Sequence, residues 1–275
     1  MHGVTGEDAR QIPETGGHHA LQNRLAVFRH PDYMVLNKSR DNRHRRCEIK
    51  AVLFDIDGTL VKCFGAGKKS LIQACRETFG TVGKMNYVDF QGKTDPLILR
   101  ESLGIMGFKE DDISRNIEAL KRRYFHHLSI NMRDSSSVML PGVRGLLDKL
   151  SGMEGVVLGL LTGNFRESAR IKLDRFDLNR NFSFGVFGDD AAHRNDMPII
   201  ARTMIKNDLG IDIPFRNIVI VGDTVYDIEC AKSAGAISIS VGTGLLDREI
   251  LLSHKPDYFF DDLSDVDRII EAILE

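Results

Sequence analysis

The chain of 275 residues contains no tryptophan and only four cysteines. The cysteines at positions 47, 63, 75 and 230 show no C-x-x-C spacing and no matching histidine pattern. This excludes the common zinc sites and favours reduced thiols over disulfides. No apolar run approaches the roughly 18 residues that cross a bilayer, and the N-terminus lacks the apolar core of a signal peptide. We therefore expect a cytoplasmic protein that has no membrane partner.

The chain also lacks an excess of charge of one sign. Its 37 Lys and Arg residues nearly balance its 39 Asp and Glu residues, so the formal net charge is -2. A chain with this balance has no general attraction for nucleic acid or anionic membrane, and we expect neither partner. Its length suits one large or two smaller domains. Nothing in the composition indicates an oligomeric state.

Residues 1–47 differ from the rest of the chain. They hold five of the nine histidines and only short apolar patches, such as that around Leu25–Phe28. We predict a mostly disordered N-terminal extension over 1–47, because such a composition cannot bury a core. The basic cluster Arg43–Arg46 is an alternative site for RNA or an acidic partner.

Polar residues follow three apolar runs, each at the point where the run ends. Asp55 and Asp57 follow Ala51–Phe54, Thr162 to Asn164 follow Val156–Leu161, and Gly222 to Asp227 follow Ile218–Val221. Runs of this length predict buried parallel strands. In open α/β sheets, ligands bind beyond the carboxyl ends of the strands, so these polar groups should meet in one crevice.

In these motifs the sequence resembles the haloacid dehalogenase-like hydrolases, and in particular their phosphatases of the phosphoglycolate phosphatase type. Asp55-x-Asp57 is similar to the family's first motif, Thr162 to the second, and Gly222-Asp223 through Asp227 to the fourth. The resemblance covers about residues 48–275. It implies an α/β fold with a doubly wound, mostly parallel, Rossmann-like sheet over 48–63 and 141–275. It also implies an all-helical cap domain over 64–140.

The third motif departs from the family pattern. The family usually has a lysine where this chain has Arg194, and an arginine keeps the charge and adds a planar fork for phosphoryl oxygens. The nearby Lys172 falls in a predicted helix after Thr162. We therefore assign Arg194 to the motif and expect Lys172 to lie outside the phosphate site.

The spacing of apolar residues predicts helices in the segment between the first and second motifs. The pattern predicts helices over 69–79, 96–106 and 112–128, and a helix over 143–150 after the return to the core. Between the first two, Phe90–Pro96 resembles the family's substrate-specificity loop, in which Lys93 could contact a substrate. The alternative is a plain helix start with Thr94 or Asp95 as cap and Pro96 at the first helical position.

The resemblance implies a Mg²⁺-dependent phosphatase that acts on a small phosphorylated metabolite through an aspartyl-phosphate. Asp55 would be the nucleophile, and Asp57 the general acid and base. The phosphoryl group would contact Thr162, Gly163, Asn164 and Arg194. Mg²⁺ would be held by Asp55, Asp223 and the backbone carbonyl of Asp57, and Asp227 would bind it through water or hold Arg194. Two alternatives stay open, a phosphomutase of the β-phosphoglucomutase kind and a non-catalytic binding protein on the same scaffold.

Overall fold

The computed structural model describes residues 48–191 and 193–275, so the predicted extension over 1–47 lies outside the described residues. A six-stranded sheet forms the centre of the fold, in the order β5-β4-β1-β6-β7-β8. Every neighbouring pair in it is parallel. The strands are β1 (Lys50–Phe54), β4 (Val156–Leu161), β5 (Phe184–Val186), β6 (Ile218–Gly222), β7 (Ile237–Val241) and β8 (Tyr258–Phe260).

The order of the strands reverses at β1. The chain runs outward from β1 through β4 to β5, then returns to the other side of β1 for β6, β7 and β8. At such a switch point the connections on the two sides diverge and leave a crevice at the carboxyl ends of the central strands. Asp55 follows directly after β1 and therefore lies at this crevice.

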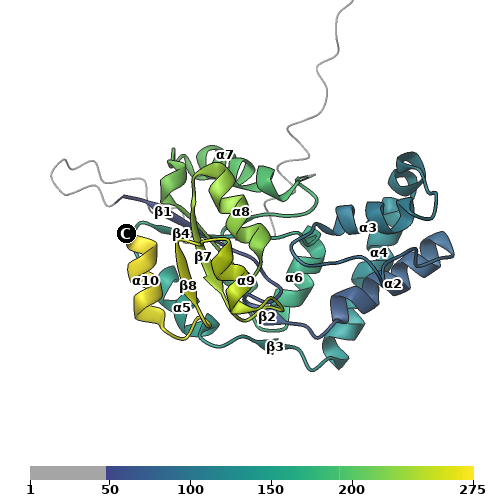
Figure 1. The fold of residues 1–275 in the computed structure, drawn as a ribbon, viewed down its shortest axis with the longest axis horizontal. Coiled ribbons are helices and arrows are strands. Elements are labelled where there is room, and N and C mark those ends of the chain that lie inside the picture. Colours follow the sequence, from purple (N-terminus) through teal and green to yellow (C-terminus); the bar gives the residue numbers. More distant parts are fainter. Residues whose placement is uncertain (1–47, 192) are drawn as a thin grey trace, which may run out of the picture.

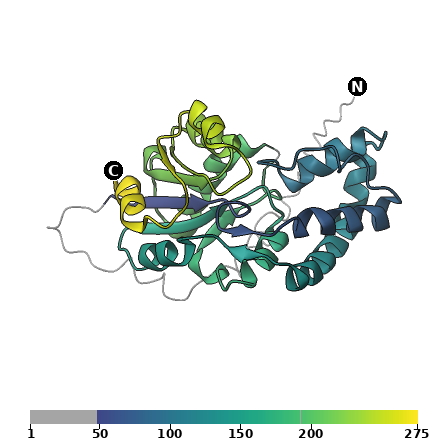
Figure 2. The same cartoon turned by 60° about the horizontal axis from the view of Figure 1, so that its bottom comes forward.

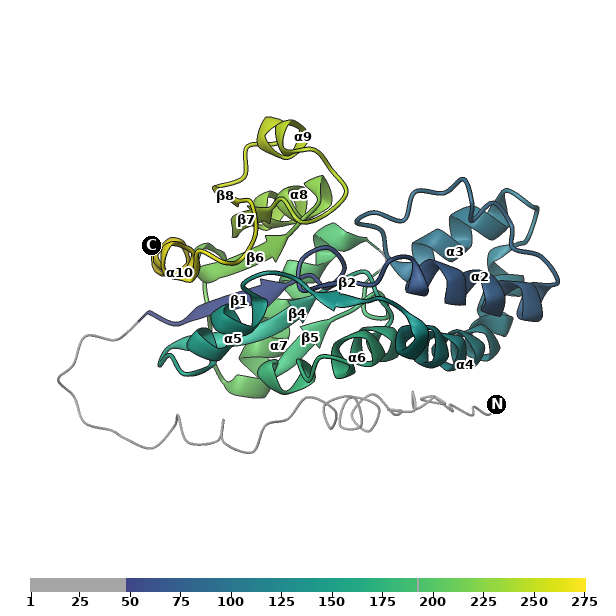
Figure 3. The same ribbon diagram turned by 90° about the horizontal axis from the view of Figure 1, so that it is seen from below.

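Helices cover both faces of the sheet, as Figure 3 shows from below. One face packs against α5 (Val143–Ser151), α6 (Arg166–Asp174) and α10 (Val266–Leu274), and the other against α7 (Met197–Leu209) and α8 (Val225–Ala234). Alternate residues of β1 serve the two layers: Val52 and Phe54 join the first, Ala51 and Leu53 the second. Burial on both faces explains why the central strands are uninterrupted apolar runs.

Three helices leave the sheet together between β1 and β4 (Figures 1 and 2). They are α2 (Ala66–Phe79), α3 (Asp95–Gly104) and α4 (Glu110–Asp134), which confirms the helices predicted in this segment. The segment joins the rest of the chain through two short antiparallel strands, β2 (Val61–Lys62) and β3 (Val138–Met139). We refer to residues 64–140 as the helical insertion.

The remaining elements are short. They are the 3-10 helices η2 (Asn179–Asn181), η3 (Arg194–Asp196) and η4 (Phe215–Asn217), and the helix α9 (Arg248–Ser253). No helix in 48–191 or 193–275 is both long and apolar enough to span a membrane. The predicted α/β fold with a mostly parallel sheet is confirmed.

Candidate active site

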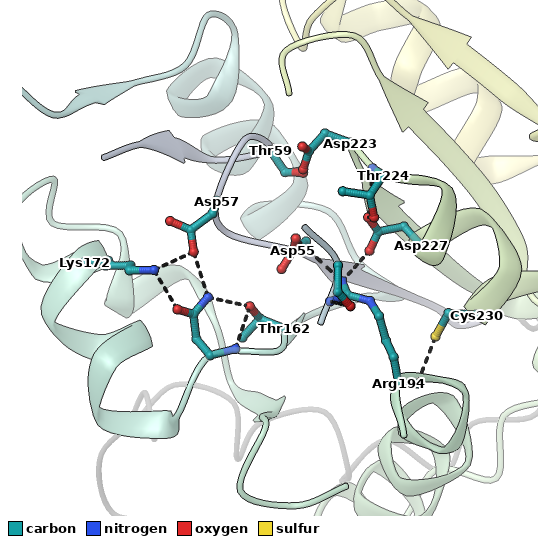
Figure 4. A network of polar contacts seen from close by, with 12 residues as sticks. Asp55, Asp57, Thr59, Thr162, Lys172, Arg194, Asp223, Thr224, Asp227 and Cys230 are labelled. Carbon is teal, nitrogen blue, oxygen red and sulfur yellow. Dashed lines mark hydrogen bonds and ion pairs between the residues drawn. The ribbon is translucent and has the colours of Figure 1, made fainter. Parts of the chain in front are cut away.

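Asp55 occupies the centre of the polar cluster at the carboxyl end of β1 (Figure 4). Its backbone N–H donates to the carbonyl of Val221 at 2.9 Å, which ties it to the end of β6. The hydroxyl of Thr162, after β4, hydrogen-bonds to its carboxylate. Arg194 Nη2 lies 3.6 Å from its Oδ2. The structure thus brings together residues that are far apart in the sequence, as the strand ends predicted.

Three buried carboxylates gather at this point. Oxygens of Asp55, Asp223 and Asp227 lie within 4.8 Å of one another. Burial raises the pKa of Asp55 to about 6, although Arg194 opposes the shift. The pKa of Asp223 also lies well above its usual range, because of burial and the charges of Asp55 and Asp227. Ionised carboxylates packed this closely call for a positive partner, and hard oxygen donors of this kind suit Mg²⁺.

The turn after Asp57 positions Asp223. Thr59 Oγ1 donates to Asp223 Oδ1 at 2.8 Å, and Thr243 Oγ1 donates to the carbonyl of Gly58 at 2.5 Å. Gly58 adopts a φ of +84°, and a Cβ atom there would lie 2.3 Å from Asp223 Oδ2. Glycine is therefore required on both conformational and steric grounds. The Asp-Gly pair of the sequence reflects this close approach.

Arg194 enters the cluster from η3, ahead of α7. Its Nη2 contacts Asp227 Oδ1 as well as Asp55, and its Nη1 donates to the carbonyl of Gly92 in the helical insertion at 3.4 Å. Its Nε has no hydrogen-bond partner among the described residues. Asp227 also accepts from the N–H and hydroxyl of Thr224, at 3.0 and 2.7 Å. Of the two roles predicted for Asp227, these contacts favour holding Arg194.

Asp57 faces a different set of partners. Its Oδ2 accepts from Lys172 Nζ at 2.5 Å and from Asn164 Nδ2 at 2.9 Å. Burial tends to raise the pKa of Asp57, but the charge and hydrogen bond of Lys172 outweigh it and hold that pKa below its usual range. Among the described residues, the carboxylates that lie close enough together to hold a metal ion are those of Asp55, Asp223 and Asp227, and the carboxylate of Asp57 is not one of them. The predicted metal contact of Asp57, through its backbone carbonyl, stays a prediction.

Lys172 was predicted to lie outside the phosphate site. Its Nζ contacts Asp57 and Asn164, so it belongs to the polar cluster, while its separation from a bound phosphoryl group stays a prediction. Lys172 belongs to α6 as predicted, but Ser168, Ala169, Lys172 and Leu173 form the buried stripe of that helix. The stripe turns Lys172 inward, where its side chain is 5% exposed. Spacing at i, i+1, i+4 and i+5 in Ser-Ala-Arg-Ile-Lys-Leu was the available signal. The prediction of a helix alone does not place its lysine, because the buried face of the helix decides where that side chain points.

The helical insertion docks against the strand ends through Asp95. The Asp95 N–H donates to the carbonyl of Gly163 at 2.8 Å, and its Oδ2 accepts from the N–H of Phe165 at 2.9 Å. Burial raises the pKa of Asp95 to about 6. The predicted cap is confirmed, because Thr94 caps α3, but Asp95 takes the first helical position predicted for Pro96, which stands second. Lys93 is not brought into the cluster, since its Nζ pairs with Glu101 Oε2 at 2.6 Å.

Comparison with known proteins gives consistent matches. The family model described as haloacid dehalogenase-like hydrolase matches residues 52–241. A phosphoglycolate phosphatase from Pseudomonas syringae pv. tomato is 26% identical over 234 residues, which is 82% of this chain and 80% of that protein. A pyrophosphatase, PpaX, from Oceanobacillus iheyensis is 24% identical over 225 residues, 81% of this chain and 97% of that protein.

Solved structures share the fold. The crystal structure of a predicted phosphoglycolate phosphatase from Haemophilus somnus superposes with a TM-score of 0.61 at 23% identity. The match covers 81% of this chain and 98% of that one. At this identity the likeness concerns the fold alone.

Proposed function

The chain belongs to the haloacid dehalogenase-like hydrolase family, and from this premise we propose that it hydrolyses a small phosphomonoester through an aspartyl-phosphate. The observation that carries the proposal is the pairing of a buried carboxylate with a buried guanidinium at the end of β1. Asp55 and Arg194 lie 3.6 Å apart there and are 6% and 8% exposed. The relatives named as phosphoglycolate phosphatase and pyrophosphatase support the same reaction class.

Asp55 acts as the nucleophile in this proposal. Phosphoryl transfer depends on positioning and on neutralising charge at the equatorial oxygens. The carboxylate of Asp55 forms a P–O bond with the substrate phosphorus as the P–O bond to the leaving group breaks. Water then attacks the phosphorus, which releases phosphate and regenerates Asp55. Arg194 and the hydroxyl of Thr162 contact this carboxylate, and with the N–H groups of Gly163 and Asn164 they bind the phosphoryl oxygens.

Asp57 acts as the general acid and base. It protonates the leaving oxygen in the first step and takes a proton from the attacking water in the second. Its contacts with Asn164 and Lys172 place it beside the motif of Thr162. A general acid and base at this position serves an oxygen leaving group.

The cluster of three buried carboxylates fits Mg²⁺. Asp55 and Asp223 offer buried oxygens to the ion, while Asp227 accepts a hydrogen bond from Arg194. Bound there, Mg²⁺ would supply positive charge against the repulsion between a carboxylate and a phosphate dianion.

The helical insertion acts as the cap over the site. Asp95 ties it to the residues after β4, and Arg194 contacts its Gly92. Because Asp55 and Arg194 are almost fully buried, the insertion has to move for a substrate to enter. A cap that closes this tightly favours small substrates, and Lys93 stays a candidate contact with them if its pair with Glu101 opens.

A phosphate-release assay over phosphorylated metabolites tests the proposal. We expect Mg²⁺-dependent release from at least one small phosphomonoester or from pyrophosphate, loss of activity with a chelator, and recovery when Mg²⁺ is restored. A phosphomutase would instead transfer the phosphoryl group to a sugar phosphate and release little phosphate. Absence of both activities across the panel would contradict the proposal.

Asp57→Asn should lower kcat by about 10²- to 10⁴-fold with alkyl phosphates, the usual range for general acid and base catalysis. With p-nitrophenyl phosphate the first step should lose less, because that leaving group needs little protonation. Single-turnover kinetics on both substrates measures the difference. Equal first-step losses would contradict the role of Asp57 as the acid.

A further inference from the structure

Lys172 holds the carboxylate of Asp57 in place together with Asn164, and we call this pair of contacts the clamp on Asp57. Its Nζ contacts Asp57 Oδ2 at 2.5 Å and Asn164 Oδ1 at 2.6 Å. Asn164 Nδ2 donates to the same Oδ2 at 2.9 Å and also to Thr162 Oγ1 at 2.8 Å. One carboxylate oxygen is thus held by two donors, and one of these donors is anchored to the second motif (Figure 4).

The helical insertion closes the other side of Lys172. A Cβ atom on Gly67 of α2 would lie 3.3 Å from Lys172 Nζ and 3.8 Å from the hydroxyl of Tyr124 on α4. Tyr124 is 1% exposed and Lys172 is 4% exposed. The ammonium group therefore lies at the boundary between the sheet domain and the insertion, with Asp57 on one side and two insertion helices near the other.

We propose that Lys172 is a positioning residue that fixes the Asp57 carboxylate when the helical insertion is docked. An ion pair weakens when water surrounds it and strengthens when water is excluded. Docking of α2 and α4 removes water from Lys172, whose side chain is 5% exposed, while that of Asp57 is 44% exposed. Docking therefore strengthens the ion pair from the lysine side. Both donors hold Oδ2, and we assign proton transfer to Oδ1. This inference rests on the proposed phosphatase function.

The geometry explains why such a clamp would affect the rate. Proton transfer requires the acid within hydrogen-bond reach of the leaving oxygen, and small displacements reduce catalysis strongly. Among the described residues, Lys172 forms an ion pair with Asp57 and none with Asp55. Loss of the Lys172 side chain should therefore slow protonation of the leaving group and should not weaken binding of the phosphoryl group.

Lys172→Met tests the clamp, because methionine keeps an unbranched side chain and removes the charge. We expect kcat for alkyl phosphates to fall by about 10²-fold, toward the loss expected for Asp57→Asn. The KM should change by less than about threefold, and the first step with p-nitrophenyl phosphate should lose less. In the Asp57→Asn background the same change should add less than about threefold, since it acts through Asp57.

Gly67→Ala gives a second test that leaves the lysine in place. The added carbon at 3.3 Å from Nζ should shift the ammonium and reduce kcat selectively for alkyl phosphates, by about three- to tenfold. Gly104→Ala is the matched control, since Gly104 lies in α3 and an added carbon there meets nothing within 4 Å. Both changes replace a glycine in an end turn of a helix by alanine, Gly67 in the first turn of α2 and Gly104 at the end of α3.

The outcomes separate the two proposals. A wild-type chain without phosphate release or phosphoryl transfer would refute the proposed function and this inference with it. With an active wild type, two results would refute the inference alone. One is an equal loss of first-step rate in Lys172→Met with both leaving groups. The other is a double variant Lys172→Met/Asp57→Asn whose fold-loss in kcat equals the product of the two single losses. A rise in the inhibition constant of inorganic phosphate with kcat unchanged would likewise overturn it, because Lys172 would then bind the phosphoryl group. An unfolded Lys172→Met leaves Gly67→Ala to decide, and equal kinetics of Gly67→Ala and Gly104→Ala would count against the clamp.

Discussion

Asp55→Asn is expected to abolish turnover, with a fall in phosphate release of at least about 10⁴-fold. The change replaces one carboxylate oxygen by an amide nitrogen and so removes the nucleophile while the side-chain volume stays almost constant. The measurements are phosphate release under saturating substrate, and acid-quench trapping of a hydroxylamine-sensitive phosphoprotein. The wild type should yield the trapped species and the variant should not.

Stability gives the control for Asp55→Asn. The carboxylate is buried against Asp223 and Asp227, and burial raises its pKa to about 6. A neutral side chain removes part of that repulsion, so the melting temperature in metal-free buffer should not fall. Asp267→Asn changes an exposed carboxylate on α10 and should leave both activity and melting temperature unchanged. Phosphate release by Asp55→Asn at the wild-type rate would refute the mechanism.

Arg194→Ala is expected to show the second large effect, a fall in kcat/KM of about 10²- to 10³-fold, the usual cost of removing one electrostatic contact to a reacting group. Arg194 pairs with Asp55 and Asp227 at 7% side-chain exposure. Removing one partner of a buried ion pair costs about 3–5 kcal/mol of stability. Chemical denaturation and steady-state kinetics measure the two effects.

Arg194→Lys separates charge from shape. Lysine restores the charge that the family commonly uses, so kcat/KM should return to within about tenfold of the wild type. Its single ammonium cannot reproduce the fork that contacts Asp55, Asp227 and the Gly92 carbonyl. Arg248→Ala removes an exposed ion pair with Asp261 and a contact with the Phe259 ring, both away from the site, and should leave kcat/KM unchanged. Full activity in Arg194→Ala would contradict the assignment of Arg194.

Local patterns predicted the parts of the fold that depend on neighbouring residues. Apolar runs over the central strands β1, β4 and β6 stood out because burial on both faces leaves no polar position. The strands β5, β7 and β8 were not identified from sequence. In β7, Ser238 and Ser240 interrupt the apolar run, and Ser238 is buried only because Asp257 accepts from both its N–H and its hydroxyl. That partner lies 19 residues away, beyond any local pattern.

The sequence alone predicted which residues lie at the strand ends, because a strand carries its following residue to a known edge of the sheet. Asp55, Thr162 and Asp223 were predictable for this reason. The pairing of charges depends on tertiary packing. Lys172 with Asp57 and Lys93 with Glu101 were not predicted, and Arg194 with Asp227 was one of two alternatives. The residues of the pairs Lys172–Asp57 and Arg194–Asp227 are 115 and 33 positions apart in the sequence. Such pairings follow from how helices pack on the sheet, which no single segment specifies.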